Sequence, residues 1–182
     1  MTVVNWIAAV GRARVVLYAC TLLCAASAGE TAFAEDPIKV AVYPFELEDF
    51  SAAGGVVPTN ARDARYLAEA TAEAKTWLAE SGKYALVDTA AVQDEPARTH
   101  TLHACQGCLG SITRTLGADQ AVIGLITRIS RTEYTLLIQF YDAGSGEPVS
   151  RYFTGLRMGA DDSWPRGVTW LMKNRILAKD RD

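Results

Sequence analysis

The sequence predicts a single α/β domain, with helices packed on a mixed sheet. Two short apolar runs, 38–45 and 83–88, flank a long segment with helical periodicity, and this order is typical of a β-α-β unit. Three further apolar runs separated by short turns lie between 121 and 153 and predict a three-stranded antiparallel meander. A final amphipathic segment supplies one more helix.

The first strand is expected at Ile38–Phe45, where a nearly continuous β-branched run indicates a strand covered on both faces. Pro44 has no N–H to donate, so it predicts the end of this strand or an irregularity in it. An acidic loop is expected next. Thr59 or Asn60 can then cap a helix that continues to about Glu80, with its apolar residues on one face.

The second half of the chain is predicted to hold a short helix followed by the meander. The helix spans 108–116, and Gly117 is a common residue at such an end. The meander strands are expected at 121–129, 134–141 and 148–153, with glycines in the second turn to allow positive φ.

The last helix is predicted at about 164–177. Asp161, Asp162 and Ser163 can cap its N-terminus, and Pro165 fits its first turn. The two aspartates are interpreted as capping residues that match the helix dipole, not as ligands.

Residues 1–34 have the pattern of a cleaved signal peptide. Two arginines precede the apolar run 15–26, which is shorter than the roughly 20 residues that a membrane span needs. Small residues follow, and cleavage is expected after Ala34 or, alternatively, after Ala28. The mature chain is then one domain, residues 35–182, located in the periplasm and without a transmembrane span. A retained amphipathic anchor and a lipid-attached cysteine are the alternatives.

Composition excludes several classes of protein. The chain has 182 residues, 49% of them apolar, and a net charge of -3, which argues against disorder and against a nucleic-acid partner. Removing 34 residues leaves 148, with 16 basic and 20 acidic side chains and two of the four cysteines. A domain of that size can fold without a disulfide or a metal.

One short segment holds four residues that ligate metals, namely His100, His103, Cys105 and Cys108. The Cys-x-x-Cys spacing suits a structural disulfide, two sulfurs on one zinc or copper ion, or a redox-active dithiol. An oxidising compartment favours a Cys105–Cys108 disulfide. A metal site would need both ligand pairs from one short segment, which strains tetrahedral closure.

The predicted acidic loop after the first strand is a second candidate. Glu46, Glu48 and Asp49 follow a strand of the β-α-β unit, where α/β sheets place ligand sites. Their oxygens could bind a hard cation such as calcium, or contact a partner, or stay solvated. The spacing is not that of an EF-hand.

The sequence lacks the motifs of common enzymes: a nucleophile elbow, a zinc-protease helix, a P-loop and a dinucleotide fingerprint. We therefore expect a non-enzymatic periplasmic binding or accessory protein. The alternatives are a metal-binding protein or metal chaperone and a thiol–disulfide oxidoreductase. No cofactor is expected other than a metal ion at the two candidate sites.

Several motifs together resemble a bacterial family of exported small proteins defined only as a domain of unknown function. They are Phe45–Ser51 (Phe-Glu-Leu-Glu-Asp-Phe-Ser), Cys105–Cys108, Leu116–Asp119, Ser163–Gly167 (Ser-Trp-Pro-Arg-Gly) and Asn174–Leu177. The resemblance covers nearly the whole mature chain and implies no catalytic residue.

The architecture is also similar to the periplasmic α/β domains of curli-secretion, flagellar-assembly and penicillin-binding-protein-activator lipoproteins. The similarity rests on the segments Val40–Phe45, Gly82–Asp88, Gly117–Gly124 and Asp142–Gly146. It implies a partner among periplasmic or envelope proteins, although the chain lacks the clear lipid-attachment motif of those proteins.

Overall fold

The computed structural model describes residues 36–52, 54, 60–92, 101–105, 107–130, 132–157 and 163–178. The predicted signal peptide, His100, and the predicted capping residues Thr59, Asp161 and Asp162 lie outside these ranges.

Six strands form one sheet: β1 (Ile38–Val42), β2 (Glu46–Asp49), β3 (Tyr84–Val87), β4 (Gln120–Arg128), β5 (Glu133–Asp142) and β6 (Pro148–Arg157). The helices are α1 (Ala61–Glu80), α2 (Cys108–Thr115) and α3 (Ser163–Leu171), the last continued by a π-helical turn, Met172–Ile176. Two single 3₁₀ turns, η1 (Ala90–Val92) and η2 (Leu102–Ala104), lie between β3 and α2.

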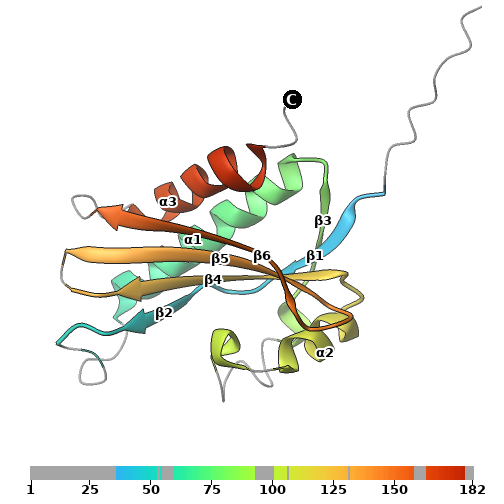
Figure 1. Ribbon diagram of the computed structural model, residues 1–182, viewed down its shortest axis with the longest axis horizontal. Helices are drawn as coiled ribbons and strands as arrows, with labels where there is room; N and C mark the ends of the chain where they lie inside the picture. Colours follow the sequence, from blue (N-terminus) through green and yellow to red (C-terminus); the bar gives the residue numbers. More distant parts are fainter. Residues whose placement is uncertain are drawn as a thin grey trace, which may run out of the picture. The chain divides into compact units, whose positions relative to one another are not determined.

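The strand order is β3-β1-β4-β5-β6, and β2 pairs with the second half of β4 (Figure 1). β1 is parallel to both β3 and β4. In the chain, α1 lies between β2 and β3 and so forms the helical part of the connection from β1 to β3. β4, β5 and β6 are antiparallel. The predicted α/β fold, with a β-α-β start and a three-stranded meander, is therefore confirmed.

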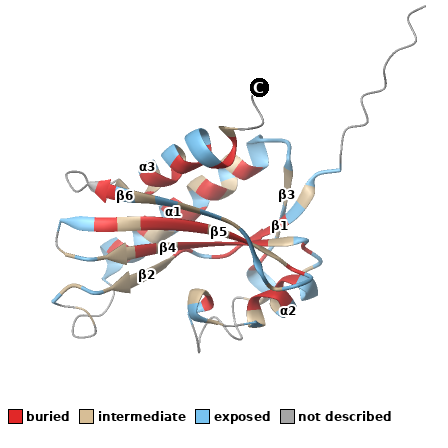
Figure 2. Cartoon of the chain, viewed as in Figure 1, coloured by how far each residue is buried: buried red, intermediate tan, exposed pale blue. Residues whose placement is uncertain are grey.

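The two faces of the sheet are covered unequally. α1 and α3 pack on one face over a large apolar core, which includes Val42, Val122, Ile138 and Val168 (Figures 1 and 2). α2 and η2 pack on the opposite face over a smaller core that involves β1, the first half of β4 and the end of β5. The face opposite α1 and α3 is called the outer face below.

The first predicted strand is interrupted where the sequence indicated. β1 ends at Val42, and the chain passes through Pro44 before pairing resumes at Glu46. Phe45 fixes this break, because its backbone N–H donates to the Thr71 hydroxyl at 2.9 Å and its ring packs directly on Gly124.

The segment predicted as an acidic loop is instead strand β2, so that prediction was wrong. Glu46–Asp49 pairs in parallel with Leu125–Arg128. Three of its four residues are acidic, so the pattern lacks the alternation that marks a strand. Pairing with β4 and the packing of Leu47 against the main core stabilise the strand nonetheless.

Two boundaries also differ from the prediction. β6 continues to Arg157 rather than ending at Phe153, because Gly155 and its neighbours keep pairing with the start of β5. α3 begins at Ser163, one residue before the predicted start, so Ser163 is the first helical residue rather than a cap, and the last turn is π-helical. Asn60 caps α1 as predicted, accepting from the N–H groups of Arg62 and Asp63 at 2.9 and 3.0 Å.

Candidate functional site

The carboxylate of Glu46 connects β2 to η2. It accepts the backbone N–H of Leu102 at 2.7 Å and that of His103 at 3.1 Å. The same oxygen that accepts the His103 N–H lies 2.6 Å from Nδ1 of the His103 ring. On the other side of the ring, Nε2 lies 3.8 Å from a carboxylate oxygen of Glu48. The imidazole is therefore held between two carboxylates on the outer face.

Cys105 and Cys108 form a disulfide, as expected from the spacing and the predicted compartment. Cys105 follows η2 directly, and Cys108 is the first residue of α2. Gly107 has φ +85°, a conformation that a side chain disfavours, and it lets the chain turn tightly between the two sulfurs. Segment 101–108 is thus held by Glu46 near its start and by the disulfide at its end.

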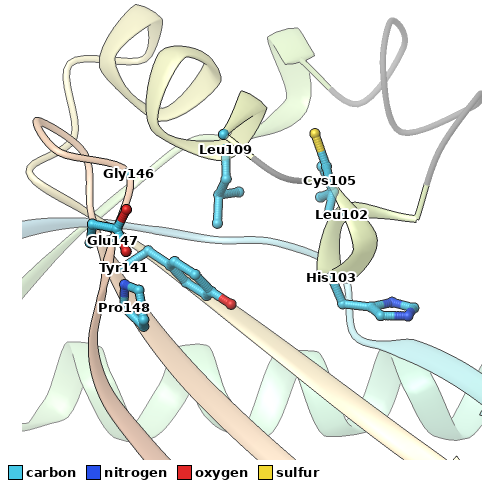
Figure 3. Close-up of a pocket in the computed structure, with 9 residues that line it drawn as sticks. Leu102, His103, Cys105, Leu109, Tyr141, Gly146, Glu147 and Pro148 are labelled. Carbon is cyan, nitrogen blue, oxygen red and sulfur yellow. The ribbon is translucent and has the colours of Figure 1, made fainter.

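A cleft of about 290 Å³ lies between this segment and the β5–β6 turn. Its lining residues are Leu102, His103, Cys105, Gly107, Leu109, Tyr141, Gly146, Glu147 and Pro148 (Figure 3). Figure 3 shows the Cys105 sulfur pointing away from the His103 ring. Burial raises the pKa of Tyr141, and the nearby Arg151 partly offsets that effect.

Close backbone packing sets one side of this cleft. A Cβ atom on Gly110 of α2 would lie 2.9 Å from the Cα of Gly146 in the β5–β6 turn. Arg114, also on α2, donates to the carbonyl oxygens of Ala143 and Gly144 at 2.7 and 2.8 Å. α2 and the turn are therefore fixed to one another.

Asp49 lies on the face opposite Glu46 and Glu48, because side chains alternate along a strand. There it accepts from Arg128 of β4 at 2.8 Å. Arg128 also donates to Asp63 of α1 at 2.8 Å and to the Tyr134 hydroxyl of β5 at 3.0 Å. This network, in which Asp63 is buried and Asp49 and Arg128 are half-buried, joins β2, β4, β5 and the start of α1.

The structure therefore separates the three carboxylates that the sequence grouped as one candidate site. Within the described residues, no cluster of three or more His, Cys, Asp or Glu side chains is arranged to hold a metal ion. His100, one of the four predicted ligands beside the cysteines, lies outside the described residues.

A surface that sequence reasoning missed runs along the outer face of β6. Phe153 is 62% exposed, and Arg151, two residues earlier, is also exposed. Between them, Tyr152 packs against the main core on the opposite face. The run Val-Ser-Arg-Tyr-Phe-Thr predicts a strand but does not show which side is covered, so only the fold reveals this exposure.

We expect Glu46→Ala to loosen segment 101–108 specifically. The variant loses a charged acceptor for two backbone N–H groups, and such a bond stabilises by about 1.5–3 kcal/mol. Amide hydrogen exchange in this segment should accelerate by roughly tenfold to a hundredfold. The matched control is Glu48→Ala, whose carboxylate lies 3.8 Å from the ring. Equal acceleration in both variants would contradict the role given to Glu46.

Stability should fall in acid partly through Asp49. Hydrogen bonds from Ser51, and then from Arg128, hold the pKa of Asp49 below its ordinary value of 3.8. A carboxyl with a lowered folded pKa stabilises the protein above its ordinary value, and this contribution disappears as the pH falls through the folded pKa. Denaturant titrations at decreasing pH should show a smaller loss of stability below about pH 4 in Asp49→Asn than in the wild type. Asp36→Asn, at an exposed position, is the control. If the stability of Asp49→Asn falls as steeply with decreasing pH as that of the wild type, the prediction is refuted.

Solved structures with related folds are distant in sequence. The lipoprotein GNA1162 from Neisseria meningitidis aligns with a TM-score of 0.49 and 16% identity, over 80% of this chain and 99% of that chain. The LpoB C-terminal domain from Escherichia coli gives 0.47 and 17%, over 66% and 83%. The PelC dodecamer from Paraburkholderia phytofirmans gives 0.44 and 16%, over 78% and 86%.

No helix in the part of the chain that the structure describes is long and apolar enough to cross a membrane. No curated protein matches the chain. A family profile does match, over residues 38–176, a range that includes every strand and helix described above. The chain belongs to the family described as "Protein of unknown function (DUF2380)".

Proposed function

We propose that the mature chain is an exported, non-enzymatic accessory domain that binds an envelope protein through the outer face of β6. The observation that carries this proposal is the exposure of Phe153 beside Arg151. Aromatic and arginine side chains dominate the binding energy of protein interfaces. A large aromatic ring that is 62% exposed on a rigid sheet is a suitable anchor for such an interface.

The polar residues of the candidate site support binding rather than catalysis. Both oxygens of Glu46 hold η2, and Asp49 holds Arg128. The disulfide fixes the segment that carries His103. Carboxylates that are already engaged in hydrogen bonds and ion pairs within the fold are suited to keeping a binding surface rigid.

The predicted signal peptide and the disulfide together support an oxidising location. Disulfides persist in the periplasm and are rare in the cytosol. We therefore place the binding partner in the periplasm or on the envelope.

The proposal is tested by quantitative co-purification from chemically cross-linked periplasm. Wild-type chain is compared with Phe153→Ser and with Trp170→Ser, which removes another large exposed ring (45% exposed) from α3. We expect Phe153→Ser to reduce the recovery of specific partners at least about tenfold and Trp170→Ser to leave it unchanged. Equal recovery with all three proteins would contradict the proposal.

A further inference from the structure

Two outer strands flank one half of the sheet, and within the described ranges the outer edge of each is unpaired. In Figure 1, β2, β4, β5 and β6 lie side by side in that order, so β2 and β6 are the outer strands. Among the described residues, β2 pairs with β4 alone and β6 with β5 alone. The outer backbone edge of each strand can therefore hydrogen-bond to an added strand, which is how open sheets bind further chains.

The side chains along these two edges are complementary. On the outer face, β6 presents Arg151 followed by Phe153, which is 62% exposed. β2 presents Glu48 on the same face, and strand alternation continued past Asp49 assigns Phe50 to that face as well. Phe50 is 67% exposed. One edge is thus basic and aromatic, and the other is acidic and aromatic.

The strand directions bring these residues into register. β2 is parallel to β4, and β4 is related to β6 by two antiparallel pairings, so β2 and β6 run in the same direction. A parallel pairing of one copy's β6 with the next copy's β2 can set Arg151 opposite Glu48 and, two residues later, Phe153 opposite Phe50. Opposite charges and aromatic pairs at such positions stabilise a sheet.

We propose that the protein associates with itself head to tail, with β6 of one copy adding in parallel to β2 of the next. This inference rests on the proposed function and names a second copy of the chain as a partner of the same surface. Because the two edges differ, the contact is heterologous and generates a ring or an open filament. β2 offers only four residues, so each contact is weak and association rises with concentration.

Sedimentation of the purified mature chain over a wide concentration range tests the inference. The average mass of the wild type should rise beyond that of a dimer. Arg151→Glu and Glu48→Arg should each raise the dissociation constant at least about tenfold. The double variant with both reversals should recover most of the affinity, because the ion pair is re-formed in the opposite sense. Glu80→Arg, an exposed reversal at the end of α1, is the control.

Phe50→Ser gives a second test of the β2 edge that leaves the His103 carboxylates unchanged, and the thermal unfolding of every variant checks its fold. A wild type that stays monomeric at all concentrations overturns the inference. So do a Phe50→Ser variant that associates like the wild type and a double reversal that recovers nothing. If partners from the periplasm still depend on Phe153 in that case, the proposed function stands; if they do not, both fail.

Discussion

Replacing Arg128 with methionine is expected to lower the free energy of unfolding by about 3–5 kcal/mol. The Arg128 guanidinium donates to one carboxylate oxygen of Asp63, a side chain that is only 5% exposed. The other oxygen of Asp63 has no hydrogen bond among the described residues. Methionine retains much of the volume but leaves this aspartate and Asp49 without their cation. Removing one member of a buried ion pair is costly because the other charge stays buried.

Denaturant unfolding monitored by circular dichroism measures this change. Arg62→Ala, at an exposed position of α1, should change stability by no more than about 0.5 kcal/mol. The double variant Arg128→Met/Asp63→Asn should be more stable than Arg128→Met alone, because the buried charge is removed. A loss below about 1 kcal/mol in Arg128→Met would show that the network contributes little.

Gly124→Ala should cost about 1–3 kcal/mol, because the added methyl group would overlap the ring of Phe45. Phe45 cannot move aside easily, because its backbone N–H is hydrogen-bonded to the Thr71 hydroxyl. The break between β1 and β2 also depends on the position of Phe45. Ring and glycine therefore form one packing unit at the centre of β4.

Gly155→Ala is the matched control, since it is also a strand glycine and an added Cβ there meets no atom within 4 Å. Alanine at this position should be neutral or stabilising by up to about 1 kcal/mol. Thermal unfolding of the two variants measures the difference. Equal effects would show that backbone flexibility, rather than the contact with Phe45, decides the cost at position 124.

The parts of the fold that follow a simple period could be predicted. α1 shows helical spacing and a capping asparagine, and the meander strands are long apolar runs separated by turn residues. β2 could not be predicted, because its sequence, Glu-Leu-Glu-Asp, has one apolar residue and forms a strand only beside β4. Local pattern fails where a tertiary pairing determines the structure.

The candidate site was predicted in its components but not in its arrangement. The disulfide is the alternative that the Cys-x-x-Cys spacing and the predicted compartment favoured. The Glu46 contacts with η2 join residues 56 and 57 positions apart, and the Arg128 network joins residues 65 and 79 positions apart. No local pattern encodes such contacts. The exposure of Phe153 likewise depends on which face α1 and α3 cover.

If the outer face of β6 is a contact surface in the cell, the side chain at position 153 lies against another protein there. This contact is tested by placing a photoreactive phenylalanine analogue at position 153. The same analogue at the exposed Thr76 of α1 is the control. After irradiation of living cells that export the chain, we expect discrete heavier adducts from position 153 and none of these from position 76. Mass spectrometry will identify each adduct as a second copy of the chain or another envelope protein. An absence of adducts at position 153, or the same adducts at both positions, would contradict the account.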